Sequence, residues 1–426
     1  ATTLSSVPTY TTRGGVHSDQ DAGQLRDAMV DEVIVRRQRL GLVPPREVEA
    51  VLRTVPRHLF APGVPLEQAY SMDSIVTKRN ERGVGISAVS APSVIAMMLG
   101  QLQVRPGQRV LEIGSGGYNS ALLQELAGPR GSVTTIDIDQ EIADRALSCL
   151  ATAGYRDVRV VCGDGEFGAP EHGPFDRIIV TVGTWGIPPA WVEQLADGGR
   201  LVVPLRTKGL NRSWILEHAD GHLVGRGPMM CGFVPMQGLG EYRGWSIRLH
   251  GDEVRLCLDA GQQVDTAALG EVLSTPRAQA WSGVTIRKGE NFSDLDLWLA
   301  RLPDFCLLSA KRDAVDRGLV SPTSTWPTTT PALTGRGDSL AYCAKLRPVD
   351  TDGTTREFGA YAHGSNAAEA ADRFAEQMRI WDRDHRHGPG PRLTVHPAPL
   401  GTDLPTELVI DRRHTRIVIS WPDHPA

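Results

Sequence analysis

Between Arg109 and Leu205, short apolar runs alternate with amphipathic stretches. The stretches 118–127, 140–152 and 188–196 have the spacing of helices. Five apolar runs between and around them are rich in β-branched residues and predict buried strands: RVLEI, SVTTI, VRVVC, DRIIVTV and RLVVPL. Strands that alternate with helices are typical of βαβ units. This part of the chain therefore predicts an α/β fold, a parallel sheet with helices on both faces.

The segment before this sheet shows a different pattern. Residues 1–20 are rich in Thr, Ser and Gly and predict a flexible leader. Apolar positions from Gln24 to Leu40 follow helical spacing, and a second short helix is expected over Pro45–Val55. Residues 71–90 are polar and irregular, so we expect no regular element there.

The pattern changes again after about residue 240. We expect, in order, a hairpin over 245–258, a helix over 291–302 and a long loop over 321–340. An amphipathic helix follows, with Ala370, Phe374, Met378 and Trp381 on one face and with Asn366 and Glu369 in a capping arrangement at its start. Two late strands, RLTVHPAP and TRIVISWP, come last. The chain is therefore divided into a leader (1–20), a sheet domain (21–240) and a C-terminal α+β extension (241–426), for which we consider substrate-peptide binding.

Composition and charge narrow the function classes. A chain of 426 residues with 41% hydrophobic residues is expected to hold two or three globular domains. The net charge of -5 gives no strong attraction to nucleic acid or to an anionic membrane, so a small ligand or a peptide is the expected partner. The six cysteines are scattered without a CxxC pair, and no metal site is expected. No apolar h-region or membrane-length run is found, which predicts a cytoplasmic protein.

The sharpest chemical signal is VLEIGSGGYNSALL, which starts at Val110. An apolar strand leads into Gly114-Ser115-Gly116-Gly117 and then into a helix. Glycines are needed where a tight turn brings bare backbone against a ligand, and the helix start beyond it supplies free N–H groups. The third glycine of the dinucleotide fingerprint is missing, because Asn119 holds that position.

Two acidic residues sharpen this signal. Asp137 ends the second strand, where a carboxylate can accept both ribose hydroxyls of a nucleoside. Asp164, in CGDG after the third strand, stands where it could meet an adenine amino group. Alternatives remain open for each, a helix N-cap for Asp137 and a turn former for Asp164. The spacing alone does not separate S-adenosylmethionine (SAM) from NAD.

An ordered set of segments covers residues 45–240: VPRHLFAP, VSAPSVIAMML, VLEIGSGGYNSALLQEL, Asp137, GDG at 163–165, FDRIIVTVG, IPPAWVEQLADGGRLVVPL and GFVPMQG. This set resembles the protein-L-isoaspartate O-methyltransferase family. The resemblance implies a Rossmann-like class I methyltransferase sheet, SAM as the cofactor, and a carboxyl O-methyltransferase. In that family the Ser of a Ser-x-Pro segment lies beside the acceptor carboxylate. Its match is Ser90, which could also cap the helix that starts near Pro92.

The motifs and the resemblance together give a set of candidate site residues. Ser90 is the candidate catalytic residue. Trp185 could wall the substrate cleft or simply pack in the core. SAM is expected to contact Glu112, Gly114, Ser115, Gly116, Asn119, Asp137, Ile138, Gly163, Asp164, Gly165 and Thr181, and the acceptor is expected to contact Ser87, Val89, Ser90, Gly183, Trp185, Phe233 and Val234.

Departures from the family pattern shape the substrate prediction. The glycine turn is one residue short of the usual GxGxG, and GVGISAVSAP replaces the usual approach to the serine. The tail after residue 240 resembles long actinobacterial forms encoded beside ribosomally synthesised, post-translationally modified peptides, with FSDLDLWLA as a matching segment. Our first hypothesis is therefore methylation of an Asp in a ribosomally made precursor peptide that is already cyclised. The methyl ester on that Asp would then form aspartimide or isoaspartate.

Three other hypotheses stay open at this stage. The first is repair of isoaspartate in damaged proteins, which uses the same chemistry. The second is a catalytically inactive SAM-fold module that binds a peptide, against which the intact glycines, Asp137, Asp164 and Ser90 argue. The third is an NAD enzyme that uses the same glycine turn.

Overall fold

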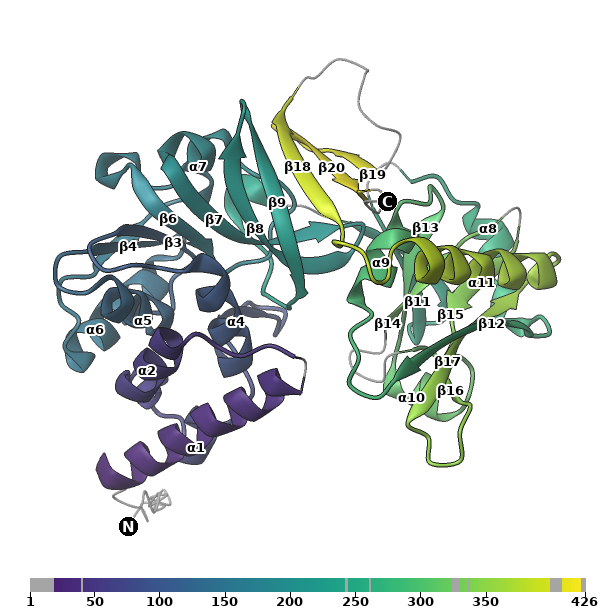
Figure 1. Cartoon of the computed structure of the whole chain (residues 1–426), viewed down its shortest axis with the longest axis horizontal. Coiled ribbons are helices and arrows are strands. Elements are labelled where there is room, and N and C mark those ends of the chain that lie inside the picture. The colour runs from purple at the N-terminus through teal and green to yellow at the C-terminus, as the bar shows by residue number, and fades with distance from the viewer. Residues whose placement is uncertain are drawn as a thin grey trace, which may run out of the picture.

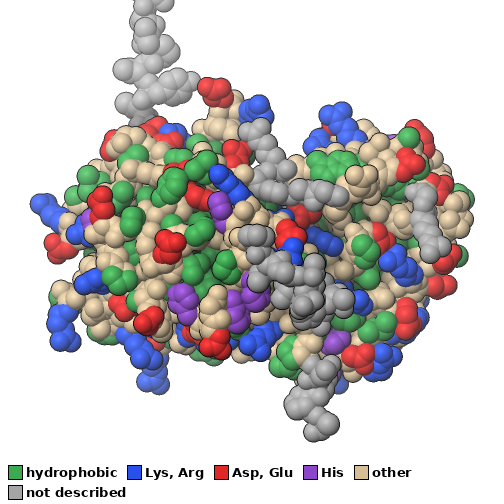
Figure 2. All heavy atoms as spheres, turned by 90° about the horizontal axis from the view of Figure 1, so that it is seen from above, with side chains coloured by type: hydrophobic (Ala, Val, Ile, Leu, Met, Phe, Trp, Pro, Cys, Tyr) green, Lys and Arg blue, Asp and Glu red, His purple; other side chains and the backbone are tan. Residues whose placement is uncertain are grey.

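The computed structural model describes residues 19–39, 41–241, 244–259, 262–323, 329–335, 338–398 and 408–422. Most of the predicted flexible leader lies outside these residues. Figure 1 shows two lobes, one holding the first nine strands and the other holding β10 to β17, with the last three strands between them. Charges of both signs are interspersed over the face seen in Figure 2.

The first lobe is built on a ten-stranded sheet, and the predicted Rossmann-like fold is confirmed. β3, β4, β5, β6 and β7 are parallel neighbours, and the following strands pair antiparallel. The order is β19-β20-β18-β9-β8-β7-β6-β3-β4-β5. The strands are β3 (Arg109–Ile113), β4 (Ser132–Asp137), β5 (Arg159–Cys162), β6 (Phe175–Val180), β7 (Leu195–Thr207), β8 (Leu210–Ala219) and β9 (His222–Met230).

Alternation along these strands sends side chains into two cores. Leu111 and Ile178 belong to one apolar cluster, whereas Val110 and Ile179 belong to the other. This is the period of two that a sheet covered on both faces requires. The helices of this lobe are α1 (Asp19–Gln38), α2 (Arg46–Thr54), α3 (Leu66–Ala69), α4 (Pro92–Leu102), α5 (Tyr118–Ala127), α6 (Gln140–Ala153) and α7 (Pro189–Gln194).

The expectation of no regular element over residues 71–90 is wrong. β1 (Ile75–Arg79) and β2 (Gly85–Val89) form an antiparallel hairpin. Polar side chains fasten this hairpin to α6: Lys78 Nζ lies 2.7 Å from Asp139 Oδ2, and Arg145 Nη2 donates to Ser87 Oγ at 3.1 Å. The strands are polar because much of their surface is only half-buried, so their sequence lacks the apolar run of a core strand.

The second lobe holds an eight-stranded sheet in the order β10-β11-β13-β14-β15-β17-β12, with β16 also on β17. The predicted hairpin over 245–258 and the predicted helix over 291–302 are found. The elements are β10 (Trp245–His250), β11 (Val254–Leu258), α8 (Thr266–Leu269), β12 (Ala278–Arg287), α9 (Ser293–Ala300), β13 (Phe305–Ala310), α10 (Arg312–Asp316), β14 (Thr329–Leu333), β15 (Leu340–Cys343), β16 (Arg347–Pro348), β17 (Thr355–His363) and α11 (Ala367–Asp384).

Two details of the second lobe differ from expectation. The long loop predicted over 321–340 contains β14, which is largely buried between β13 and β15; its Thr and Pro residues hid the strand. The amphipathic helix forms as α11 and buries Phe374 and Met378, but Asn366 makes no capping bond. Its side-chain amide instead donates to Ser365 Oγ at 3.3 Å.

The chain then returns to the first lobe. Three last strands extend the first lobe's sheet beyond β9: β18 (Arg392–Pro397), β19 (Leu408–Asp411) and β20 (Thr415–Ser420). Leu393 of β18 lies opposite Gly225 of β9. The apolar cluster on one face of that sheet also includes Phe305 and Phe358 of the second lobe. The two lobes therefore share a core, which the division at residue 240 did not anticipate. In the described ranges, no helix combines the length and apolar character needed to cross a bilayer.

Candidate functional site

The site begins where the strand order reverses, between β3 and β6. β3 is followed in the chain by β4 on one side, whereas β6 pairs with it on the other. At such a switch point the loops leave in opposite directions and open a crevice outside the carboxyl ends of the strands. Gly114 and Thr181 follow these two strands, and Thr181 Oγ1 lies 2.8 Å from the Gly114 carbonyl oxygen, to which it donates.

The glycine turn after β3 has no room for a side chain at Gly114. Gly114 has φ +95°, and a Cβ there would lie 2.8 Å from Thr181 Oγ1 and 2.9 Å from Val182 Cγ1. A Cβ on Gly116 would lie 3.6 Å from the Ala88 carbonyl oxygen. The bare backbone therefore allows a ligand to approach closely, as the sequence predicts.

Asp137 fixes this turn from the end of β4. Its Oδ2 accepts the backbone N–H of Ser115 at 2.9 Å, and its Oδ1 accepts that of Asp139 at 3.0 Å. The N-cap of α6 is Asp139, whose carboxylate accepts the N–H groups of Glu141 and Ile142, so Asp137 is not the cap. Burial raises the pKa of Asp137 above its usual value, although the two backbone bonds oppose this shift.

Two hollows flank the glycine turn. The first, here the Asp137 hollow, is lined by Gly114, Asp137, Ile138 and Gly165 among other residues. The second, here the Ser90 hollow, is lined by Ser90, Val89, Gly116, Asn119, Thr181 and Phe233 among others. Each spans about 400 Å³, part of which is open to solvent. Candidate residues distant in the sequence therefore meet on both sides of one turn.

Asp164 acts as a turn former and a tether. Its Oδ1 accepts the backbone N–H of Glu166, and its Oδ2 accepts that of Leu239, each at 2.9 Å. The Gly163 N–H donates to the Asp137 carbonyl oxygen at 2.8 Å. The turn alternative from the sequence is thus observed, and it is Gly165, not the Asp164 side chain, that lines the Asp137 hollow.

Glu112, which is buried, and Asn119, which is half-buried, form a polar pair on the wall of the Ser90 hollow. Asn119 Nδ2 donates to Glu112 Oε1 at 2.8 Å, Thr135 Oγ1 donates to Oε2 at 2.7 Å, and Ser120 Oγ donates to Oε2 as well. Burial raises the pKa of Glu112, and these three hydrogen bonds oppose the shift. Glu112 is therefore occupied within the protein, where it orders the start of α5.

Ser90 lies between β2 and α4, on the wall of its hollow. The cap residue of α4 is Ala91 and makes no side-chain bond, so Ser90 does not cap this helix. Sequence reasoning missed the support beneath it. Arg57 is fully buried, and its Nη2 lies 3.5 Å from the carbonyl oxygen of Val89, to which it donates. A charged residue inside the apolar segment VPRHLFAP was the available signal.

Arg57 donates hydrogen bonds to backbone carbonyl oxygens of separate segments of the chain. Its Nε donates to the Ala69 carbonyl oxygen at 2.9 Å, and its guanidinium lies 5.1 Å from the ring centre of Tyr118. Within the part of the chain that the structure describes, no ion pair involves Arg57. Burial lowers its pKa.

Four predicted acceptor-binding residues lie outside the Ser90 hollow. Ser87 is bonded to Thr77 and Arg145. Gly183 and Val234 pair through backbone, with the Gly183 N–H donating to the Val234 carbonyl oxygen at 2.8 Å. Trp185 is buried in the core and faces a different pocket. Val89 and Phe233 do line the hollow with Ser90.

The chemistry of the site suits a nucleoside carrying a charged side arm. Apolar side chains such as Ile113 and Ile138 line the Asp137 hollow beside a carboxylate, which fits a flat ring with hydroxyl groups attached. Ser115 Oγ is buried and has no partner among the described residues, so a polar ligand group could satisfy it. Over the same residues, no group of three or more potential metal ligands is found.

Comparison with known proteins gives one family. The family model "Protein-L-isoaspartate(D-aspartate) O-methyltransferase (PCMT)" matches residues 28–241. A protein-L-isoaspartate O-methyltransferase of Methanopyrus kandleri is 37% identical over 40% of this chain and 74% of its own length. Protein-L-isoaspartate O-methyltransferase 2 of Archaeoglobus fulgidus is 35% identical over 51% of this chain and 96% of its own length. A solved structure titled protein-L-isoaspartate O-methyltransferase aligns with 93% of this chain and 99% of its own, at 19% identity and a TM-score of 0.48.

Proposed function

Because the chain belongs to the protein-L-isoaspartate(D-aspartate) O-methyltransferase family, we propose that it methylates the free carboxylate of an isoaspartyl residue in a polypeptide. The chain is a SAM-dependent carboxyl methyltransferase. The observation that carries the proposal is the position of Ser90, which shares a hollow with Gly116 of the cofactor turn.

The residues of the Asp137 hollow fit the nucleoside of SAM. Asp137 would accept the ribose hydroxyls, and Ile138 and Ile113 would pack on the adenine ring. The bare backbone from Gly114 to Gly116 and the Ser115 hydroxyl would receive the amino-acid arm. When bound, SAM supplies an electrophilic methyl group on a positively charged sulfur.

The protein's own part in the reaction is orientation. The acceptor carboxylate is already ionised at neutral pH, so no general base is needed. The Ser90 hydroxyl would donate a hydrogen bond to that carboxylate and hold one oxygen toward the turn. Phe233 and Val89 would exclude water from the same hollow. Such positioning is worth about 7–11 kcal/mol at best.

Isoaspartate is favoured over our first hypothesis, an ordinary Asp in a modified precursor peptide. The family model and the curated relatives support the repair alternative better, and none of the relatives named above is described as a precursor-peptide enzyme. The precursor hypothesis rested on the tail after residue 240, whose last strands belong to the cofactor sheet itself. The tail therefore has a structural role in the sheet, and this role does not require a precursor peptide as the substrate.

The decisive experiment compares acceptors that differ in one linkage. Two peptides of the same sequence, one with isoaspartate and one with ordinary aspartate, are incubated with the full chain and SAM labelled in its methyl group. We expect methyl ester on the isoaspartyl peptide only. Turnover of the aspartyl peptide, or of a cyclised precursor peptide alone, would overturn the proposal in favour of peptide tailoring.

A further inference from the structure

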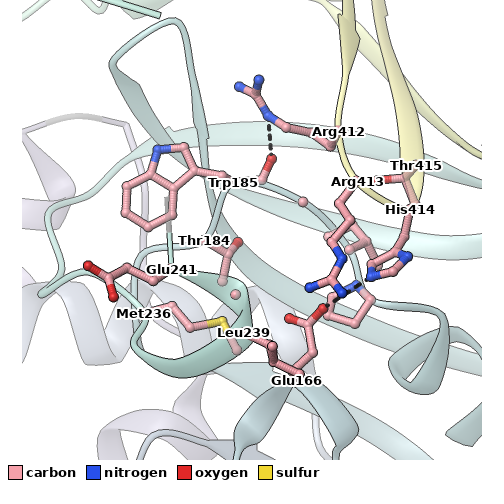
Figure 3. A pocket seen from close by; sticks show the side chains of 14 residues that line it. Glu166, Thr184, Trp185, Met236, Leu239, Glu241, Arg412, Arg413, His414 and Thr415 are labelled. Atoms are coloured by element: carbon pink, nitrogen blue, oxygen red, sulfur yellow. Dashed lines mark hydrogen bonds and ion pairs between the residues drawn. The ribbon is translucent and has the colours of Figure 1, made fainter. Parts of the chain in front are cut away.

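A separate pocket opens beside the cofactor crevice, where the tip of the β19–β20 hairpin meets the methyltransferase sheet. It spans about 560 Å³, part of which is open to solvent, and is lined by residues 184–188, by Met236 and residues 239–241, by Glu166, and by residues 412–415 (Figure 3). We call it the hairpin pocket. None of the roles described above uses it, although two far-apart parts of the chain build it.

The hairpin tip is fixed firmly against the loop after β6. Arg412 Nε donates to the Trp185 carbonyl oxygen at 2.8 Å, as Figure 3 shows. Arg412 also forms an ion pair with Asp259 at 3.1 Å, and both of these side chains are only 10% exposed. The Arg206 guanidinium lies over the Trp185 ring, 5.2 Å from its centre. The pocket is therefore a preformed feature.

Its inner surface combines an apolar wall with one unsatisfied polar group. Trp185, Ile187 and Met236 are buried side chains that line it. Thr415 is 5% exposed, and its Oγ1 has no hydrogen-bond partner among the described residues. A buried hydroxyl without a partner is costly, so such groups often mark the place of a ligand atom.

Of the cationic side chains that line the pocket, one has no ion-pair partner at contact distance in the described part of the chain. Arg412 is engaged by Asp259, and His414 Nε2 lies 3.6 Å from Glu166 Oε1. Glu241 also lines the pocket and already interacts with another group. Arg413 is exposed, and no ion pair or hydrogen bond of its side chain is found in the described part of the chain; burial raises the pKa of the neighbouring Glu166, and the charge of Arg413 opposes that shift from a longer distance. A ligand would therefore meet a guanidinium at the rim and an apolar wall inside.

The pocket continues the line of the two hollows in the proposed active site. Thr181 lines the Ser90 hollow, Val182 lines the Asp137 hollow, and Trp185 lines the hairpin pocket. A second segment, which begins at Phe233, lines the Ser90 hollow, the Asp137 hollow and the hairpin pocket in the same order. It pairs with residues 181–185 through the Gly183–Pro235 bridge. Four extended residues span about 13–14 Å, so a peptide held at Ser90 would need only a few more residues to reach the pocket.

We propose that the hairpin pocket binds the part of the acceptor polypeptide that flanks the methylated residue, taking an apolar side chain next to an acidic group. This inference rests on the proposed function, since it assumes a polypeptide acceptor. The apolar side chain packs against Trp185 and Met236, the peptide backbone bonds the Thr415 hydroxyl, and the acidic group pairs with Arg413. The tail thereby contributes to the choice of substrate.

The test uses the full chain and three isoaspartyl peptides, one short and two long. The short peptide ends beside the isoaspartate; the long peptides add about five residues, including a Leu-Glu pair, on either the N-terminal or the C-terminal side. For one of the long peptides we expect KM to be lower than for the short one. Arg413→Glu should raise KM for that long peptide about fivefold or more, with unchanged kcat and an unchanged KM for the short peptide. Arg156→Glu, an exposed arginine on the opposite edge of the sheet, is the matched control.

Thr415→Val provides a second, independent readout. Because the hydroxyl has no partner among the residues that the structure describes, the variant should unfold at the same temperature as the wild type or a higher one, while KM for the long peptide rises. Equal KM values for all the peptides, or no response of the long peptide to Arg413→Glu, would refute the pocket and leave the proposed function intact. Absence of methylation of every isoaspartyl peptide by the wild type would instead refute the proposed function.

Discussion

Asp137 Oδ2 accepts the backbone N–H of Ser115 at 2.9 Å, so a carboxylate at the end of one strand holds the bare turn that follows its neighbour. The carboxylate that would receive the ribose thus also positions the backbone that would receive the rest of the cofactor. The two halves of the cofactor site are therefore coupled through one side chain.

Asp137→Asn should weaken SAM binding more than it weakens the fold. An amide keeps one acceptor oxygen in place of two and loses the charge, so one of the two backbone N–H bonds is lost. We expect the Kd for SAM to rise about tenfold or more, measured by calorimetry. Asp164→Asn is the informative comparison, because that carboxylate bonds only backbone outside the hollow. A larger effect on SAM at position 164 would contradict this account.

Gly114→Ala should abolish cofactor binding and destabilise the fold. The added Cβ would meet Thr181 and Val182 at less than 3 Å, at a φ of +95°. Gly107→Ala is a matched control, because Gly107 has φ +89° and open space around it. We expect Gly114→Ala to cost about 1–3 kcal/mol more than the control in chemical denaturation. Equal losses would mean that backbone conformation, and not contact, requires the glycine.

Ser90→Ala should slow methyl transfer without loosening SAM. The serine makes no capping bond, so the fold does not depend on its hydroxyl. Loss of a hydrogen bond to a charged acceptor predicts about a 10- to 100-fold fall in kcat/KM. Ser93→Ala, in the first turn of α4, should leave the rate unchanged, since Ser93 does not line the hollow. A parallel loss of SAM affinity in Ser90→Ala would show that this serine acts on the cofactor.

Glu112 gives a prediction of pH dependence. Burial raises its pKa in the folded protein, so the unfolded chain releases this proton at a lower pH than the folded one. The contribution of Glu112 to stability is therefore fully present below the unfolded pKa and is lost as the pH rises through the folded pKa. Glu112→Gln cannot ionise, so it should gain in stability relative to the wild type as the pH rises above the ordinary pKa of a glutamate.

Urea unfolding at several pH values measures this gain. Glu171→Gln, which makes the same substitution at an exposed position, serves as the reference. A constant difference between Glu112→Gln and the wild type would show that Glu112 ionises normally in the folded chain.

A fragment of residues 19–240 should fail to fold as a stable unit. Without β18 the edge of β9 is bare, and one core loses Phe305 and Phe358. Arg212, whose side chain is only 4% exposed, would also lose its partner Asp296. We expect an aggregated or expanded fragment by size-exclusion chromatography and circular dichroism. A compact fragment that binds SAM would support the sequence-based domain division.

Local pattern predicted the centre of the molecule well. β3 to β6 and α5 and α6 are where the runs and the helical spacing place them, because each buries a continuous apolar surface. The β1–β2 hairpin was missed because its strands are half-buried and are held by ion pairs such as Lys78–Asp139. The pairing of β18 with β9 was also missed, since partners so far apart leave no local signal.

Candidate site residues could also be predicted only where their signal in the sequence is local. Gly114, Asp137 and Ser90 were found because their motifs are short and contiguous. Arg57 was overlooked because its role depends on backbone carbonyls that only the folded chain brings to it. Trp185 follows β6, as expected, but the loop turns its ring toward the hairpin pocket and away from Ser90.

The late pairing of β18 with β9 also sets a timetable for biosynthesis. The ribosome releases β9 long before β18, because residues 231–391 must be translated between them. At a typical rate this takes about 10–30 s, during which an unpaired strand edge is open to other nascent chains. We therefore expect the newborn protein to depend on chaperones until β18 emerges, and to acquire enzymatic competence only after this strand has paired with β9.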